Sequence, residues 1–127
     1  MISRVPAVLF VDDEHGVLAA IRRTVRREPF RKFFAGTAEE ALNILRNNDI
    51  SVMVTDLRMP GMDGLELIRR AKEHNPRLMC IILTASYDAK TIKEALDRGE
   101  IYAVIRKPWN RQQLISCVRE ALPESTS

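Results

Sequence analysis

The apolar run Ile50-Ser51-Val52-Met53-Val54-Thr55 ends on a carboxylate, Asp56, and the turn Met59-Pro60-Gly61-Met62-Asp63-Gly64 follows it. A second run, Val8-Leu9-Phe10-Val11, ends in the same way on the acidic cluster Asp12-Asp13-Glu14. Burying clustered carboxylates costs stability, so this arrangement implies a bound cation or a reaction. Both clusters stand at the end of a predicted buried strand, where a carboxylate is well placed for chemistry.

Short apolar runs alternate with amphipathic segments five times along the chain. We expect strands at residues 7–11, 30–35, 50–55, 78–84 and 101–106. Five helices are expected to begin near residues 15, 37, 64, 88 and 110 and to end near 28, 47, 75, 98 and 122. Thr37-Ala38-Glu39-Glu40 matches a capping box, Asn110 an N-cap and Gly99 a C-terminal cap. Strands rich in Val, Ile and Leu, separated by helices, predict one doubly wound (βα)5 domain with a parallel sheet.

The 127 residues suit a single domain with one core. We expect the domain over residues 1–122, with 123–127 as a disordered tail or the start of a linker. No apolar run reaches the length of a membrane span, and Cys80 and Cys117 lack the spacing of a zinc site or a disulfide framework. The chain is therefore expected to be a soluble cytoplasmic protein that does not contact a membrane.

A basic cluster lies on the first predicted helix and the segment after it. Its members are Arg22, Arg23, Arg26, Arg27, Arg31 and Lys32. Such a cluster can contact phosphate groups, but it is more often a solvated helix face, and the net charge of +3 is modest. We therefore expect no direct nucleic-acid binding by this domain.

Ligands in open α/β sheets bind beyond the carboxyl ends of the strands. Four of the five predicted strands end on groups that can bind a ligand: Asp12 with Asp13, Asp56, Thr84, and Lys107 with Pro108. Each group alone is weak evidence, because a strand-end aspartate is more often a helix cap or a turn residue. Together, three carboxylates, a hydroxyl and an ammonium form a site for a hard divalent cation and a phosphoryl group. Oxygen ligands without His or Cys favour Mg²⁺ over zinc.

These motifs resemble the signature of response-regulator receiver domains of two-component signalling, over about residues 7–122. The matching segments are Val11-Asp12-Asp13-Glu14, Asp56 with Met59-Pro60-Gly61-Met62-Asp63-Gly64, Thr84-Ala85 and Lys107-Pro108. The resemblance implies a flavodoxin-like sheet of five parallel strands in the order 2-1-3-4-5.

The resemblance also implies a role for each site residue. The implied Mg²⁺ ligands are the carboxylates of Asp12, Asp13 and Asp56 and the backbone carbonyl of Arg58. Asp56 is the implied phosphoacceptor, Thr84 hydrogen-bonds the phosphoryl oxygen, and Lys107 pairs with it. Arg58 and Ser86, each two positions beyond a site residue, are implied to tune the lifetime of the phosphoryl group.

The implied function is that of a phosphoacceptor signalling domain rather than an enzyme. A sensor histidine kinase or a phosphotransfer protein donates the phosphoryl group, the domain holds it as a mixed anhydride, and water removes it slowly. The signal leaves through the surface around the fourth helix, fifth strand and fifth helix. A C-terminal effector domain in a full-length protein and a homodimer are both compatible with the resemblance.

Two other functions fit a strand-end aspartate on this fold. A Mg²⁺-dependent phosphohydrolase usually needs a second acid two residues after its nucleophile, where this chain has Arg58. A flavodoxin-like nucleotide binder needs a phosphate loop after the first strand, where this chain has acids that repel phosphate. Turnover of a phosphate ester would favour the first, copurifying yellow colour the second, and stoichiometric base-labile labelling the receiver.

One position departs from the family pattern. Receivers usually carry an aromatic residue three positions before the lysine of Lys-Pro, and here that residue is Val104. The period-two rule predicts that the nearest aromatic, Tyr102, lies on the same face of the fifth strand. Because β-branched Val104 has few rotamers, we expect output to depend on residues 85–88 and the fourth helix. Tyr102 and Trp109 then form a static partner surface, although Trp109 equally suits a role covering the base of the last helix.

Overall fold

The computed structural model describes residues 5–86 and 88–123. The strands are β1 (Ala7–Val11), β2 (Arg31–Ala35), β3 (Val52–Thr55), β4 (Met79–Thr84) and β5 (Ala103–Arg106). The helices are α1 (His15–Val25), α2 (Ala38–Asn47), α3 (Gly64–His74), α4 (Ala89–Asp97) and α5 (Arg111–Ala121). None of these helices is long and apolar enough to cross a membrane.

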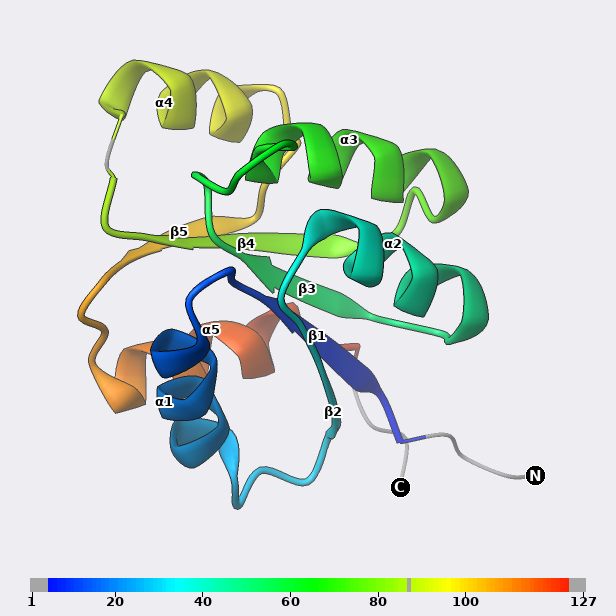
Figure 1. The fold of residues 1–127 in the computed structure, drawn as a ribbon, viewed down its shortest axis with the longest axis vertical. Helices are drawn as coiled ribbons and strands as arrows, with labels where there is room; N and C mark the ends of the chain where they lie inside the picture. Colours follow the sequence, from blue (N-terminus) through cyan, green and yellow to red (C-terminus); the bar gives the residue numbers. More distant parts are fainter. Residues whose placement is uncertain (1–4, 87, 124–127) are drawn as a thin grey trace.

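The five strands form one parallel sheet in the order β2-β1-β3-β4-β5, which confirms the predicted fold. Helices α1 and α5 cover one face of this sheet, and α2, α3 and α4 cover the other (Figure 1). The chain moves outward from β1 to β2 and then returns to the opposite side of β1 with β3. This reversal places a topological switch point at the carboxyl ends of β1 and β3, where doubly wound sheets bind their ligands.

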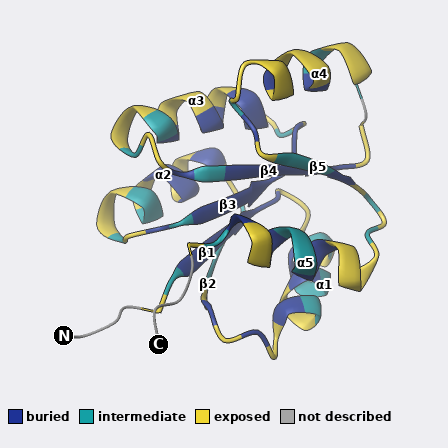
Figure 2. Cartoon of the chain, turned by 180° about the vertical axis from the view of Figure 1, so that it is seen from behind, coloured by how far each residue is buried: buried dark blue, intermediate teal, exposed yellow. Residues whose placement is uncertain are grey.

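Two apolar layers, one on each face of the sheet, form the core. Leu9 and Met53 belong to the layer that also contains buried residues of α2, α3 and α4, whereas Phe10 and Ile81 belong to the layer of α1 and α5. The central strands β1, β3 and β4 are buried almost throughout, the edge strands β2 and β5 are only partly buried, and many exposed residues lie on the outer faces of the helices (Figure 2). Because both faces of β1 are covered, all five of its residues are buried, as its uniformly apolar sequence predicts.

Polar caps begin four of the five helices. The predicted capping box is present: the Thr37 hydroxyl accepts from the Glu40 amide at 3.1 Å, and the Glu40 carboxylate accepts from the Gly36 amide at 2.6 Å. The side chains of Asp63, Asp88 and Asn110 cap α3, α4 and α5 in the same manner. The predicted C-terminal cap of α4 is also confirmed, since Gly99 has a φ of 73°.

The strands β3, β4 and β5 begin one or two residues later than the apolar pattern predicts. Ile50, Leu78 and Ile101 precede these strands, yet they are only 1%, 1% and 4% exposed. Hydrophobicity reports burial rather than ladder pairing, so these residues belong to the core but not to the strands. Similarly, α1 ends at Val25, and a further turn, closed by the Glu28 amide on the Val25 carbonyl, leads to β2.

Candidate functional site

Strand register brings the predicted site residues to one edge of the sheet. Val11 lies opposite Thr55 in the β1–β3 pair, and the next amide, that of Asp56, donates to the Val11 carbonyl at 3.0 Å. On the other side of the switch point, the Lys107 amide donates to the carbonyl of Thr84 at 3.0 Å. Thr55 pairs with Ile82, so β4 extends two residues beyond the end of β3. The residues that follow the four strands still meet at this edge, where Lys107 contacts Asp12 and Asp56.

Lys107 bridges the two buried aspartates of this edge. Its Nζ lies 2.5 Å from Oδ2 of Asp12 and 2.9 Å from Oδ2 of Asp56. Asp12 is 1% exposed and Asp56 6%, so one ammonium compensates two carboxylates that are largely removed from water. Burial acts to lower the pKa of Lys107, but the hydrogen bonds that it donates to Asp12 and Asp56 outweigh it, and the pKa is raised. The lysine therefore remains charged and bound to both carboxylates.

Asp13 completes a cluster of three carboxylates. Oxygen atoms of Asp12, Asp13 and Asp56 all lie within 4.8 Å of one another, and Asp13 is exposed. The second oxygen of Asp12 accepts from the Glu14 amide at 2.9 Å, which fixes that carboxylate on the β1–α1 loop. Three carboxylate oxygens without a nitrogen or sulfur donor are a ligand set that suits Mg²⁺. The residues present thus fit the expected cation.

Thr84 is fully buried at the end of β4. Its hydroxyl accepts from the amide of Ser86 at 3.1 Å, so it is bonded to its own loop rather than to the carboxylates. Ser86 itself is exposed. The structure therefore brings Thr84 to the predicted edge, where its hydroxyl donates to the carbonyl of Ser86 at 3.4 Å.

Arg58 joins the loop that follows Asp56 to the start of α4. Its amide lies 3.4 Å from Oδ1 of Asp56, and its guanidinium Nη2 lies 3.6 Å from Oδ2 of Asp88. The sequence indicated Asp88 only as the beginning of a helix. Hydrogen bonds from Thr91, and then the charge of Arg58, lower the pKa of the Asp88 carboxyl.

Gly64 is a second residue whose importance the sequence did not reveal. Its amide donates to the Leu57 carbonyl at 2.8 Å, which closes the β3–α3 loop. A Cβ atom at this position would lie 2.1 Å from the backbone oxygen of Asp56. Only glycine fits this close approach, so the turn after Asp56 depends on it. Its place at the end of the Met-Pro-Gly-Met-Asp-Gly turn was the one available signal.

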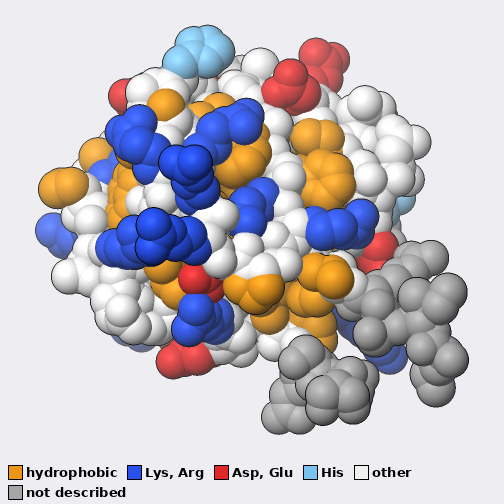
Figure 3. Space-filling view, turned by 90° about the horizontal axis from the view of Figure 1, so that it is seen from below, with side chains coloured by type: hydrophobic (Ala, Val, Ile, Leu, Met, Phe, Trp, Pro, Cys, Tyr) orange, Lys and Arg blue, Asp and Glu red, His pale blue; other side chains and the backbone are white. Residues whose placement is uncertain are grey.

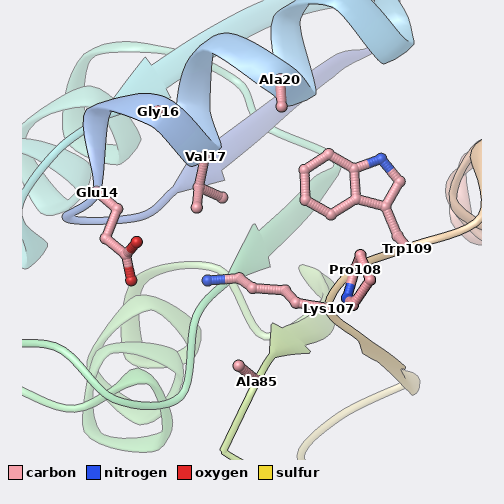
Figure 4. Close-up of a pocket in the computed structure, with 8 residues that line it drawn as sticks. All are labelled: Glu14, Gly16, Val17, Ala20, Ala85, Lys107, Pro108 and Trp109. Carbon is pink, nitrogen blue, oxygen red and sulfur yellow. The ribbon is translucent and has the colours of Figure 1, made fainter.

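A pocket opens beside the carboxylate cluster, between α1 and the loops that follow β4 and β5. It is lined by Glu14, Gly16, Val17, Ala20, Ala85, Lys107, Pro108 and Trp109. In Figure 4 the Lys107 side chain points toward Glu14, and the indole ring of Trp109 lies near Ala20. The indole Nε1 donates to the Thr24 hydroxyl of α1 at 3.0 Å, so Trp109 packs against α1. Its role in binding a partner stays a prediction.

The prediction that Tyr102 lies on the same face of the fifth strand as Val104 was wrong. Tyr102 lies in a bend before β5, which begins at Ala103, so the alternation of strand faces does not extend to it. Val104 packs with the core layer of α2, α3 and α4. Tyr102 is 40% exposed, and desolvation followed by the charges of Glu120 and Cys117 on α5 raises its pKa. Tyr102 therefore lies on the α5 side, away from Val104.

The basic cluster packs in part on aromatic rings. Figure 3 shows Lys and Arg side chains gathered over one part of the face seen from below, with apolar side chains between them. The Arg22 guanidinium lies 4.0 Å from the centroid of the Phe34 ring, and Lys32 Nζ lies 5.3 Å from that of Phe30. These cation–π contacts stabilise the join between α1 and β2. The expectation that the cluster does not bind nucleic acid remains a prediction.

The chain matches the model of the response regulator receiver domain family over residues 8–119. Its structure is similar to that of the signal receiver domain of an HD domain-containing protein from Pseudomonas fluorescens. The TM-score is 0.87 at 32% identity, and the match covers 93% of this chain and 94% of that one. Receiver domains bind Mg²⁺ at an acidic cluster, and this chain carries three clustered aspartates.

Two curated relatives agree with that match. Sporulation initiation phosphotransferase F of Bacillus subtilis is 28% identical, over 91% of this chain and 93% of its own length. The hydrogenase transcriptional regulatory protein HoxA of Cupriavidus necator is 35% identical over 96% of this chain, which spans only 25% of that regulator. The chain therefore belongs to the response regulator receiver domains, the phosphoacceptor signalling domains of two-component systems.

Proposed function

We propose that Asp56 is the residue of this receiver domain that accepts the phosphoryl group. The observation that supports this most directly is the shared contact of Lys107 Nζ with Asp12 at 2.5 Å and Asp56 at 2.9 Å. A carboxylate held against a fixed ammonium at the switch point of the sheet is ready to receive an anionic group, because the neutralising charge is already in place. Asp12, which Lys107 also contacts, is more deeply buried than Asp56.

The proposed transfer begins with attack of an Asp56 carboxylate oxygen on the phosphorus of a phosphohistidine. The new oxygen–phosphorus bond forms as the phosphorus–nitrogen bond breaks, and the donor imidazole leaves with the electron pair. The product is a mixed anhydride on Asp56, from which water later releases inorganic phosphate. Lys107 would then pair with the phosphoryl oxygens, and Thr84 would turn its hydroxyl from the Ser86 carbonyl toward them.

We propose that Asp12, Asp13, Asp56 and the backbone carbonyl of Arg58 hold Mg²⁺. The mutual proximity of the three carboxylates supports this assignment, since negative charges that close together repel one another unless a cation compensates them. When bound, Mg²⁺ supplies neutralisation of the charge on the transferring phosphoryl group. Before Mg²⁺ binds, the Lys107 ammonium compensates the charges of Asp12 and Asp56.

The biological setting proposed for this domain follows from its family. The donor is a sensor histidine kinase or a phosphotransfer protein, and the domain acts in the cytoplasm without catalysing a reaction beyond slow loss of its own phosphoryl group. Residues 1–122 form the receiver and 123–127 a tail or linker, although 1–4 and 124–127 lie outside the described residues. Because the chain spans 25% of the hydrogenase regulator HoxA, an effector domain beyond it is part of the proposal.

The phosphoacceptor is tested by treating the protein with acetyl phosphate and Mg²⁺ and locating the label by mass spectrometry. One acid-stable, base-labile phosphoryl group should appear on Asp56, and Asp56→Asn should abolish it. If Asp56→Asn still gains a full equivalent of label, the assignment is wrong. Turnover of a generic phosphate ester would instead support a hydrolase.

Calorimetric titration tests the metal site. Asp13→Ala should weaken Mg²⁺ binding and labelling together, because Mg²⁺ binds through few charged ligands and sheds its water reluctantly. Asp49→Ala serves as the matched control, since Asp49 is an exposed aspartate between α2 and β3. An unchanged Mg²⁺ titration in Asp13→Ala would show that this carboxylate is not a ligand.

We also propose that phosphorylation alters the surface around α4, β5 and α5. Val104 is half-buried and β-branched, so the change should run from Thr84 through the β4–α4 loop and α4, while Tyr102 and Trp109 stay in place. Tyr87 of that loop lies outside the described residues. Amide exchange with and without beryllofluoride and Mg²⁺ tests this switch. Changes of amide protection in α4 would support it, and changes confined to the metal-binding loops would contradict it.

A further inference from the structure

Arg58 contacts one aspartate through its backbone and another through its side chain. Its backbone amide contacts Asp56, while its guanidinium lies 3.6 Å from Asp88 at the start of α4. Both side chains of this ion pair are substantially exposed, 56% for Arg58 and 42% for Asp88. At that distance the pair is a charge contact without a hydrogen bond, so it separates readily.

Asp88 is the fixed member of the pair. Its Oδ1 accepts from the Thr91 amide at 3.2 Å, and its Oδ2 accepts from the Thr91 hydroxyl at 2.8 Å. Both carboxylate oxygens are thus held by the first turn of α4. Arg58 lies on the β3–α3 loop, and its guanidinium has no other ion-pair partner among the described carboxylates. A change of partner therefore moves the Arg58 side chain and leaves the hydrogen bonds between Asp88 and Thr91 intact.

A phosphoryl group on Asp56 would be a stronger partner for this guanidinium than Asp88 is. The group carries more negative charge than a carboxylate, and its oxygens match the planar fork of an arginine. Phosphorylation would also place it two residues from Arg58, while Lys107 is already shared between two carboxylates. Besides Lys107, Arg58 is therefore a second cation that can turn toward Asp56 when the charge there increases.

Resting on the proposed phosphorylation of Asp56, we propose that Asp88 is a positioning residue that competes with the phosphoryl group for the Arg58 guanidinium and so shortens the phosphoryl lifetime. A guanidinium bound to the phosphoryl oxygens covers the anhydride and excludes the attacking water. A guanidinium held by Asp88 leaves that side open. The balance between these two contacts sets how long the signal lasts.

The variant Asp88→Asn separates this role from helix capping. Asparagine caps helices as well as aspartate does, so the hydrogen bond to the Thr91 amide is retained while the charge is lost. Asp97→Asn is the matched control on the same helix. It removes a carboxylate that pairs with Lys93 at 2.9 Å, with the same change in net charge and no contact with Arg58.

The test labels each protein with acetyl phosphate and Mg²⁺, removes the donor and follows the decay relative to the initial label. Asp88→Asn should lengthen the half-life about 1.5- to 5-fold, the range that an exposed ion pair allows, and Asp97→Asn should not change it. In an Arg58→Ala background, Asp88→Asn should have no effect. Amide exchange of α4 without Mg²⁺ or label should be the same in Asp88→Asn as in the parent, as expected if the cap is intact.

Two results would overturn the proposal while leaving the phosphoacceptor assignment standing. Equal decay in Asp88→Asn and the parent would show that the ion pair does not compete. The same lengthening in the Arg58→Ala background would assign the effect to the start of α4 rather than to the guanidinium. A parent protein that takes no label on Asp56 would refute this inference and the proposed function together.

Discussion

Replacing Gly64 with alanine should destabilise the protein and displace the β3–α3 loop. An added Cβ would lie 2.1 Å from the backbone oxygen of Asp56, and real Cβ atoms essentially never approach closer than 3.0 Å. The loop or the start of α3 must therefore move by about 0.9 Å, the difference between these distances. The contacted atom is backbone, so no rotamer change can relieve the clash.

The expected cost is about 2 kcal/mol in the free energy of unfolding. Overpacking in a rigid site costs roughly 1–3 kcal/mol, and the higher helix propensity of alanine returns at most about 1 kcal/mol at the start of a helix. Urea unfolding followed by circular dichroism measures this difference. Mg²⁺ affinity should fall as well, because the shift carries the proposed Arg58 carbonyl ligand with it, and calorimetry measures that change.

Gly16→Ala is the matched control for this variant. Gly16 lies in the first turn of α1, its φ is not positive, and no atom lies within 4 Å of an added Cβ. That substitution should leave stability unchanged or raise it by up to about 1 kcal/mol. If Gly64→Ala is as stable as Gly16→Ala and binds Mg²⁺ equally well, the close approach of Gly64 to Asp56 does not constrain the β3–α3 loop.

Three further perturbations test the charges and thiols of the structure. Without Mg²⁺, Lys107→Met should lower the free energy of unfolding measured in urea by about 3 kcal/mol, because it leaves two buried carboxylates uncompensated. Mg²⁺ should restore most of that loss, and an equal loss with Mg²⁺ would contradict a compensating role for Lys107. The hydrogen bond from Arg69 lowers the pKa of Glu100 below 4.5, so this pair contributes stability above pH 4.5 that is lost as pH falls through the lowered pKa. Glu100→Gln should flatten that acid limb by less than about 1 kcal/mol, since Arg69 is half exposed, and an unchanged pH profile would show that the pair contributes nothing. Burial raises the pKa of the Cys80 thiol to about 12, and it raises the pKa of the half-buried Cys117 thiol less. A thiol reagent at near-neutral pH should therefore modify Cys117 first. Mass spectrometry that finds Cys80 labelled first would refute this order.

The secondary structure was predictable because its signals are local. Apolar runs, the capping box at Thr37, and the caps at Asn110 and Gly99 each involve neighbouring residues, and each was found where expected. The starts of β3, β4 and β5 were less accurate, since a strand begins where a neighbouring strand pairs with it. Strand order was supplied by resemblance to the family, because no local pattern reports which strands are adjacent.

The site was predictable only as a set of residue types at strand ends. The sequence placed Asp56, Thr84 and Lys107 correctly at the carboxyl edge, and strand register explains why they meet. It did not reveal that Lys107 bonds two carboxylates, or that the Thr84 hydroxyl is bonded to Ser86. The position of Tyr102 was wrong because face alternation holds only within a strand, and the strand begins one residue later.

The amino-acid sequence thus specifies the elements, their caps and the chemistry carried at each strand end, because these depend on residues close together in the chain. Contacts between distant segments depend on how helices and loops pack across the sheet. The Lys107 contact with Asp12 joins residues 95 positions apart, and the Arg58 contact with Asp88 joins two loops that no periodicity relates. Such contacts form where the parallel strands end at a common edge, so the charge arrangement of the site emerges only when the chain has folded.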